Sequence, residues 1–161
     1  MTDNLSLEEM MPVIEEKLSE GGEVTFTVTG NSMLPMLHNR QDTVTLVTPT
    51  FPLKKYDLPF YRRNGGLYTL HRIVKIKKVN YIIRGDNCNF TEYGIEDKDI
   101  IGVVKQFTRN GKQHTVNEKS YKIYCALWCN DACYFLRKKV LLNLRRVASK
   151  IKRTIFSRGK R

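Results

Sequence analysis

The spacing of hydrophobic and polar positions changes twice along the chain, which divides it into three parts. In residues 1–22 apolar side chains recur at helical intervals before a Gly-Gly pair. These are Leu7, Met10, Met11, Ile14 and Leu18. Together with the capping-box sequence that starts at Ser6, this pattern predicts a short amphipathic helix. We expect its apolar face to pack on the rest of the protein or, alternatively, to bind a partner peptide.

From residue 23 onward apolar and polar residues alternate, which is the period of a β-strand. The predicted strands cover residues 24–29, 43–48, 58–61, 67–79, 81–84, 100–107 and 113–116. Turn sequences such as Asn110-Gly111 lie between them. Many short strands without intervening helices indicate a mainly β fold, with an antiparallel coiled sheet or partial barrel in residues 23–117.

Helical spacing returns in residues 118–161, together with a large excess of positive charge. Residues 137–161 hold eleven lysines and arginines and no acidic residue, so they supply most of the net charge of +12. Basic residues among large apolar ones are typical of helices that lie in an anionic membrane interface. The segment therefore predicts a basic amphipathic helix or helix pair on a membrane surface. Nucleic-acid binding through the same charges, or a solvated helix capping the β-region, is the alternative.

The sequence shows neither the pattern of a transmembrane helix nor that of a secretory signal. No stretch reaches the roughly 18 consecutive apolar residues of a transmembrane helix. The N-terminal residues are acidic and lack the apolar region of a secretory signal. We expect a cytoplasmic protein, held peripherally at the inner face of the membrane by its tail.

The cysteines are more suited to packing than to metal binding. Cys125, Cys129 and Cys133 recur every four residues, which places them on one face of a helix, while Cys88 stands apart. A thiolate metal site is the alternative, but His114 is the only histidine nearby and no Cys-x-x-Cys sequence occurs. We predict small packing residues on a buried stripe, and no metal.

Two sequence segments carry residue types suited to nucleophilic catalysis. Ser32 follows Gly30-Asn31 in an apolar, bent loop, and His71 lies 39 residues later in a predicted strand. A serine hydroxyl becomes a useful nucleophile only when a positioned base accepts its proton. Histidine, with an ordinary pKa of about 6.5, can do this near neutral pH. Ser32 and His71 are therefore a candidate nucleophile and base.

The sequences Gly-Asn-Ser-Met-Leu-Pro at residues 30–35, Leu-His-Arg-Ile-Val at 70–74 and Arg-Gly-Asp-Asn at 84–87 resemble the boxes of the signal peptidase and LexA-type superfamily of serine peptidases. The resemblance covers residues 23–106. The His-Arg pair is similar to the histidine branch, which is typical of endoplasmic-reticulum and archaeal signal peptidases. The resemblance implies an all-β fold with the catalytic groups on its concave side and no metal or organic cofactor.

The same resemblance implies roles for individual residues of the serine box. Ser32 would be the nucleophile, Met33 would line the substrate pocket and Pro35 would stiffen the loop. Together with Gly30, where the chain can turn sharply, Met33 and Pro35 are the candidate substrate-binding residues. Two acids compete for the role of orienting His71. Asp86 matches the Gly-Asp-Asn box and ranks slightly first for importance of any kind, although the residues of this box are also common in turns. Glu92 lies where the histidine branch has its triad acid, so both stay open.

The sequence predicts a signal-peptidase-like serine endopeptidase that cleaves a peptide or protein precursor through an acyl-enzyme. The expected substrate is an extended peptide that pairs with a sheet edge. The resemblance to the family implies small side chains next to the scissile bond. The alternatives are a LexA-type self-cleaving regulator, a catalytically inactive peptide-binding module, and a nucleic-acid binder that uses the basic tail. The residues before the β-region are too few for a helix-turn-helix, which counts against the regulator.

Overall fold

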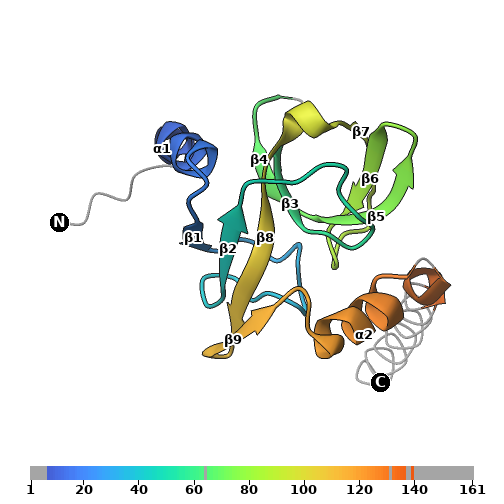
Figure 1. Cartoon of the computed structure of the whole chain (residues 1–161). Helices are drawn as coiled ribbons and strands as arrows, with labels where there is room; N and C mark the ends of the chain where they lie inside the picture. The colour runs from blue at the N-terminus through green and yellow to red at the C-terminus, as the bar shows by residue number, and fades with distance from the viewer. Residues whose placement is uncertain (1–6, 64, 131, 137–138, 140–161) are drawn as a thin grey trace, which may run out of the picture.

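The computed structural model describes residues 7–63, 65–130, 132–136 and 139, and it is mainly β with helices at both ends of the described chain (Figure 1). In chain order the elements are α1 (Leu7–Ser19), β1 (Val24–Thr27), β2 (Thr43–Val47), β3 (Pro59–Arg62), β4 (Tyr68–Leu70), β5 (Arg72–Lys77), β6 (Asn80–Arg84), β7 (Glu92–Ile95), the 3-10 helix η1 (Asp97–Asp99), β8 (Ile100–Arg109), β9 (Lys112–Thr115) and α2 (Lys119–Trp128). The predicted fold class is confirmed, including the short N-terminal helix and the helical C-terminal region.

Two antiparallel sheets form the body of the protein. The larger has the strand order β1-β2-β8-β3-β4, with β9 paired to β8, and the smaller has the order β5-β6-β7. The antiparallel sheet curls into a half-barrel. Register shifts lie at Thr45/Leu46 and at Phe60/Tyr61, on the strands that flank β8. Such irregularities increase local twist and bend a strand, which suits a sheet that must curl.

The core surrounds the central strand β8 and includes residues of both helices. From α1, Met11, Ile14 and Leu18 are at most 3% exposed. From α2, Tyr121 and Cys125 belong to the same buried cluster. Burial of one large apolar side chain contributes roughly 1.5–3 kcal/mol. The apolar face of α1 therefore packs on the β-structure, which is the first of the two outcomes expected for it.

Residues 67–79 do not form the single strand that their alternation predicts. β4 pairs with β3 in the larger sheet, β5 pairs with β6 in the smaller one, and His71 lies at the break between them. His71, Arg72, Ile73 and Val74 are all buried, so no alternation of exposure marks this crossing. The prediction is wrong here because local spacing does not show where a chain passes from one sheet to another.

The smaller sheet contains a strand that the sequence did not indicate. β7 has only four residues, and its Gly94 has a positive φ of 78°, so neither length nor composition marks it as a strand. It pairs with β6 through Tyr81↔Ile95 and Ile83↔Glu92. This pairing brings Glu92 to the part of the sheet where β5 begins.

Other local predictions agree with the structure. The Asn110-Gly111 turn joins β8 to β9 with φ values of 50° and 73°, as expected for a tight hairpin turn. Cys125 and Cys129 are buried, as predicted, but α2 ends at Trp128 and Cys133 is half-buried, so the three cysteines do not form one buried stripe on a single helix. Within the described ranges, no helix is long and apolar enough to cross a membrane. Ser6 of the predicted cap, and the basic stretch 137–161 apart from Lys139, lie outside the described residues.

Candidate active site

The loop between β1 and β2 carries Ser32 and is held by its apolar side chains. Met33, Met36 and Leu37 are at most 5% exposed and belong to the main core, which leaves Ser32 half-buried at the surface. Gly30 has a φ of 86°, a backbone conformation that glycine adopts without strain. The chain thus makes a sharp turn at Gly30 and is tightly packed from Met33 onward, and Ser32 lies between these two parts of the loop.

His71 lies at the crossing between the two sheets and is only 3% exposed. Its Nδ1 is 2.9 Å from Glu92 Oε1, and the ring packs edge-on against Phe90. A carboxylate can only accept hydrogen bonds, so Nδ1 carries the proton and donates it to Glu92. The other ring nitrogen, Nε2, is then unprotonated and able to accept a proton.

Glu92 is held by two further donors besides His71. The Tyr61 hydroxyl donates to Glu92 Oε1 over 2.9 Å, and Arg63 Nε pairs with Oε2 at 2.6 Å. Burial and the neighbouring Glu92 carboxylate raise the pKa of Tyr61, so this phenol stays protonated and can donate. With three donors around it, Glu92 is fixed in the geometry that orients the imidazole.

Burial has the largest effect on the proton affinity of His71. It lowers the pKa of the imidazole below its ordinary value, and the hydrogen bond and charge of Glu92 oppose this only in part. The ring is therefore neutral at neutral pH, which is the protonation state that a general base requires.

The loop that carries Ser32 and the ring of His71 meet at Gly85. A methyl group placed on Gly85 would lie 2.7 Å from the Ser32 carbonyl oxygen and 2.9 Å from His71 Nε2. The Asn87 amide donates to the same Ser32 oxygen over 2.8 Å, and its side chain donates to the Asn31 carbonyl. The Gly-Asp-Asn loop therefore joins the serine loop to the histidine, and only a residue without a side chain fits at position 85.

The side chain of Cys88 lies beside the unprotonated nitrogen of the imidazole. Its sulfur lies 3.9 Å from His71 Nε2, and the residue is half-buried. Burial raises the pKa of this thiol, so it remains protonated at neutral pH. Among the described residues, the hydrogen-bond partners of the His71 ring are Tyr61, Glu92 and Cys88, and Ser32 is not one of them. In structures without substrate, the hydrogen bond between a nucleophile and its base is often long or poorly aligned.

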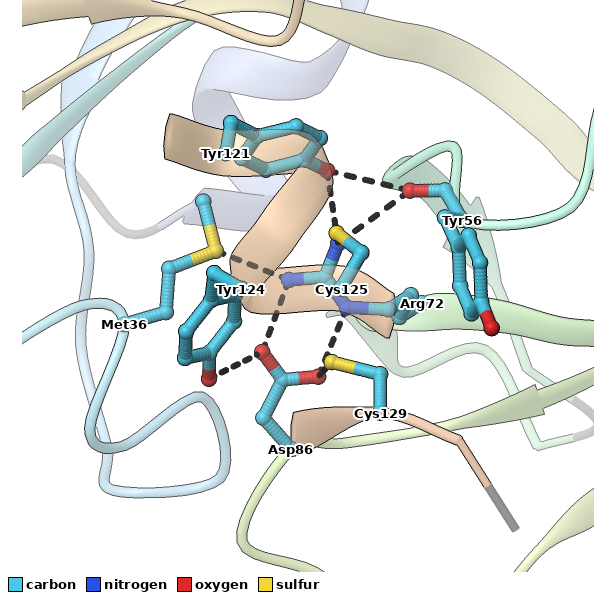
Figure 2. Close-up of polar contacts among 8 residues, drawn as sticks. All are labelled: Met36, Tyr56, Arg72, Asp86, Tyr121, Tyr124, Cys125 and Cys129. Carbon is cyan, nitrogen blue, oxygen red and sulfur yellow. Dashed lines mark hydrogen bonds and ion pairs between the residues drawn. The ribbon is translucent and has the colours of Figure 1, made fainter. Parts of the chain in front are cut away.

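Asp86 contacts Arg72 (Figure 2), and it is not among the hydrogen-bond partners of the His71 ring in the described part of the chain. Arg72 Nε and Nη2 donate to its two carboxylate oxygens over 2.8 Å and 2.7 Å, and both side chains are buried. The structure thus assigns different partners to the two acids that the sequence left open. Glu92 contacts His71, whereas Asp86 holds the arginine that follows it.

Residues of α2 and of the serine loop complete the surroundings of this ion pair (Figure 2). Tyr124 donates a hydrogen bond to Asp86 over 3.0 Å, and the Arg72 Nη1 group lies 2.6 Å from the Tyr121 hydroxyl. Arg72 Nη2 lies 2.8 Å from the sulfur of Met36, on the loop that carries the serine. Helix α2 is therefore packed directly against the segments that position Ser32 and His71.

A groove of about 310 Å³ begins at Ser32 and follows β1 between α1 and β4. Gly30 and Met33 line it, while Pro35 lies half-buried in the turn that follows. β1 and β4 lie at the two ends of the strand order of the larger sheet, so each has backbone groups able to pair with an extended peptide. The lining of the groove is mostly apolar and includes Phe60 of β3.

Sequence reasoning did not identify Tyr61, Arg63 and Cys88 as site residues. Cys88 directly follows the Gly-Asp-Asn box, and its position was the one signal that could have indicated it. Tyr61 and Arg63 reach Glu92 only through the pairing of distant strands, which leaves no local signal.

Among the residues that the structure describes, no group of three or more His, Cys, Asp or Glu side chains could hold a metal ion. A scan against protein-family models and searches of the curated proteins and of the solved structures find no match to this chain. Its function is therefore inferred from the residues and the geometry of the site.

Proposed function

We propose that the protein is a serine endopeptidase in which Ser32, His71 and Glu92 act together. The observation that carries this proposal is the hydrogen bond from His71 Nδ1 to Glu92 Oε1, which leaves Nε2 as an acceptor beside the serine loop. A serine, a histidine base and an orienting acid together form a triad able to carry out acyl-enzyme chemistry. The order of the sequence boxes, similar to that of signal peptidases, supports the same assignment.

In the proposed reaction His71 Nε2 takes the Ser32 proton as Oγ attacks the carbonyl carbon of the scissile peptide bond. Glu92 stabilises the imidazolium that forms, because its carboxylate accepts the Nδ1 proton. The imidazolium then gives its proton to the leaving amine, and the carbon–nitrogen bond breaks. A water molecule, deprotonated by the same histidine, releases the acyl group and restores the serine hydroxyl.

The backbone amides of Ser32 and Met33 are suited to binding the oxyanion. Within the described chain neither amide donates a hydrogen bond to another backbone group, so both are available next to the reacting carbon. Removal of one such donor typically costs about 2.7–4 kcal/mol of transition-state stabilisation.

The groove indicates how a substrate would bind. An extended peptide can pair with the free edge of β1 and place alternate side chains toward the apolar lining between α1 and β4. Its path ends at Ser32, so the bond to be cut lies where the nucleophile is. Peptides with apolar side chains on one side of the cut are therefore the proposed substrate class.

A fluorophosphonate probe and a mixed peptide library test the proposal. Wild type should be labelled at Ser32, and the variants Ser32→Ala and His71→Ala should lose both labelling and cleavage. His114→Ala is a matched control, because His114 also pairs with a glutamate, Glu118, at 3.1 Å but lies elsewhere. Equal labelling and cleavage in wild type, Ser32→Ala and His71→Ala would refute the peptidase function.

The same experiment separates the alternatives. A catalytically inactive peptide-binding module would bind library peptides without cleaving them, and Cys88 next to Nε2 is the observation that favours it. A self-cleaving regulator would cut its own chain on incubation, and Ser32→Ala would stop this. Either result would show that the protein does not act by cleaving other peptides.

A further inference from the structure

Helix α2 has one face fixed to the protein and one face turned away from it. Tyr121, Cys125 and Cys129 are at most 7% exposed and contact the buried Arg72–Asp86 pair (Figure 2). These hydrogen bonds and the packing beneath them set the rotation of the helix about its axis. The opposite face is therefore held outward.

The outward face of α2 is apolar at its centre. Ile123 and Leu127, one helical turn apart, are 58% and 66% exposed. We call Ile123 and Leu127 the apolar ridge of α2. In the separate helical stretch 132–136 that follows α2, Phe135 and Leu136 are each 64% exposed as well. Large apolar side chains that remain in water at one end of a domain indicate an interaction surface.

Positive charge accompanies the ridge. Lys119 and Lys122 are exposed on the same side of α2 as Ile123, and Lys139 is exposed beyond Leu136. From residue 119 onward the sequence holds thirteen lysines and arginines and a single acid, Asp131. A surface that joins large apolar side chains to unbalanced positive charge is complementary to anionic lipid headgroups over an acyl layer. Nucleic acid would use the charges but would leave the apolar side chains exposed.

We propose that the apolar ridge of α2 inserts into the interface of an anionic phospholipid membrane, with Lys119 and Lys122 on the headgroups. Because α2 also packs on the Arg72–Asp86 pair, membrane binding would hold the candidate active site close to the bilayer. Figure 1 shows α2 at the end of the molecule away from α1, so the helix that lines the groove stays off this surface. The proposal does not depend on catalysis.

Vesicle co-sedimentation of the full chain tests the proposal. The vesicles are phosphatidylcholine alone, and an equal mixture of phosphatidylcholine and phosphatidylglycerol. Wild type and Ser32→Ala should bind equally to the mixture and weakly to phosphatidylcholine. Ile123→Ser/Leu127→Ser should lower the partition coefficient on the mixture at least about tenfold, because two exposed apolar side chains no longer insert.

The matched control is Leu67→Ser/Val79→Ser, which removes two apolar side chains that are 61% and 77% exposed in turns of the β-region. It should bind the mixed vesicles like wild type. Circular dichroism should show the same fold for both double variants, since all four positions are exposed.

Three results would overturn the proposal. Wild type could fail to bind the mixed vesicles, the Ile123→Ser/Leu127→Ser variant could bind them as well as wild type, or the control could lose as much binding as that variant. Binding of wild type to a duplex RNA in place of the vesicles would assign the surface to nucleic acid.

Discussion

Removal of the Asp86 carboxylate should destabilise the protein far more than removal of an exposed acid. Arg72 is fully buried, and its guanidinium donates two charge-assisted hydrogen bonds to Asp86, over 2.8 Å and 2.7 Å. Burial opposes its charge, yet the Asp86 carboxylate keeps the pKa of Arg72 well above its usual value. In Asp86→Ala the arginine therefore stays charged and buried with its main partner gone.

The expected loss is about 3–5 kcal/mol of unfolding free energy, which is typical when one member of a buried ion pair is removed. This is a large part of the roughly 5–15 kcal/mol that stabilises a domain. The contacts from Tyr121, the Tyr56 carbonyl and Met36 remain, but none of them carries a negative charge at neutral pH. They do not replace the carboxylate.

Urea unfolding followed by circular dichroism measures the effect. With a slope of about 2 kcal/mol per molar, the midpoint should fall by roughly 2 M. Glu15→Ala is the matched control, because it breaks the exposed Arg62–Glu15 pair at 3.3 Å and should cost about 0–1 kcal/mol. Arg72→Met/Asp86→Leu should recover much of the loss, since it removes the unpaired charge. An Asp86→Ala loss no larger than that of Glu15→Ala would refute the reasoning.

The remaining predictions concern activity. The acid limb of the kcat/KM pH profile should lie below about pH 6.5 because burial lowers the pKa of His71; a limb above that value would contradict this. Glu92→Gln should lower kcat/KM about 10²- to 10⁴-fold and move the limb to still lower pH, since Glu92 raises that pKa; an unmoved limb would count against the contact. Gly85→Ala should lower peptide cleavage about 10²-fold while circular dichroism is unchanged, because its methyl group displaces the Ser32 loop, and full activity would disprove this. Iodoacetamide at alkaline pH, where part of the Cys88 thiol is ionised, should inactivate wild type but not Cys88→Ala, as a carboxamidomethyl group beside Nε2 would block proton transfer; an enzyme modified at Cys88 and fully active would exclude this geometry.

The order of local elements was predictable because it depends on neighbouring residues. Helical spacing indicated α1, and the Asn110-Gly111 pair indicated the β8–β9 hairpin. The two boxes that contain Ser32 and His71 were recognisable in the same way, since each is a short run of residues. Alternation of apolar and polar positions was sufficient for a mainly β fold, because it reports the period of the backbone.

Tertiary structure decided which residues meet. The resemblance left open whether Asp86 or Glu92 orients His71. The pairing of β6 with β7 brings Glu92 to His71, while Asp86 contacts Arg72. The crossing of the chain between sheets at residue 71, and the groove between α1, β1 and β4, likewise depend on pairing between distant strands. The local spacing of apolar residues determines whether a segment forms a helix or a strand. Contacts between segments depend on strand register and on how two sheets pack, and no single stretch of residues encodes these.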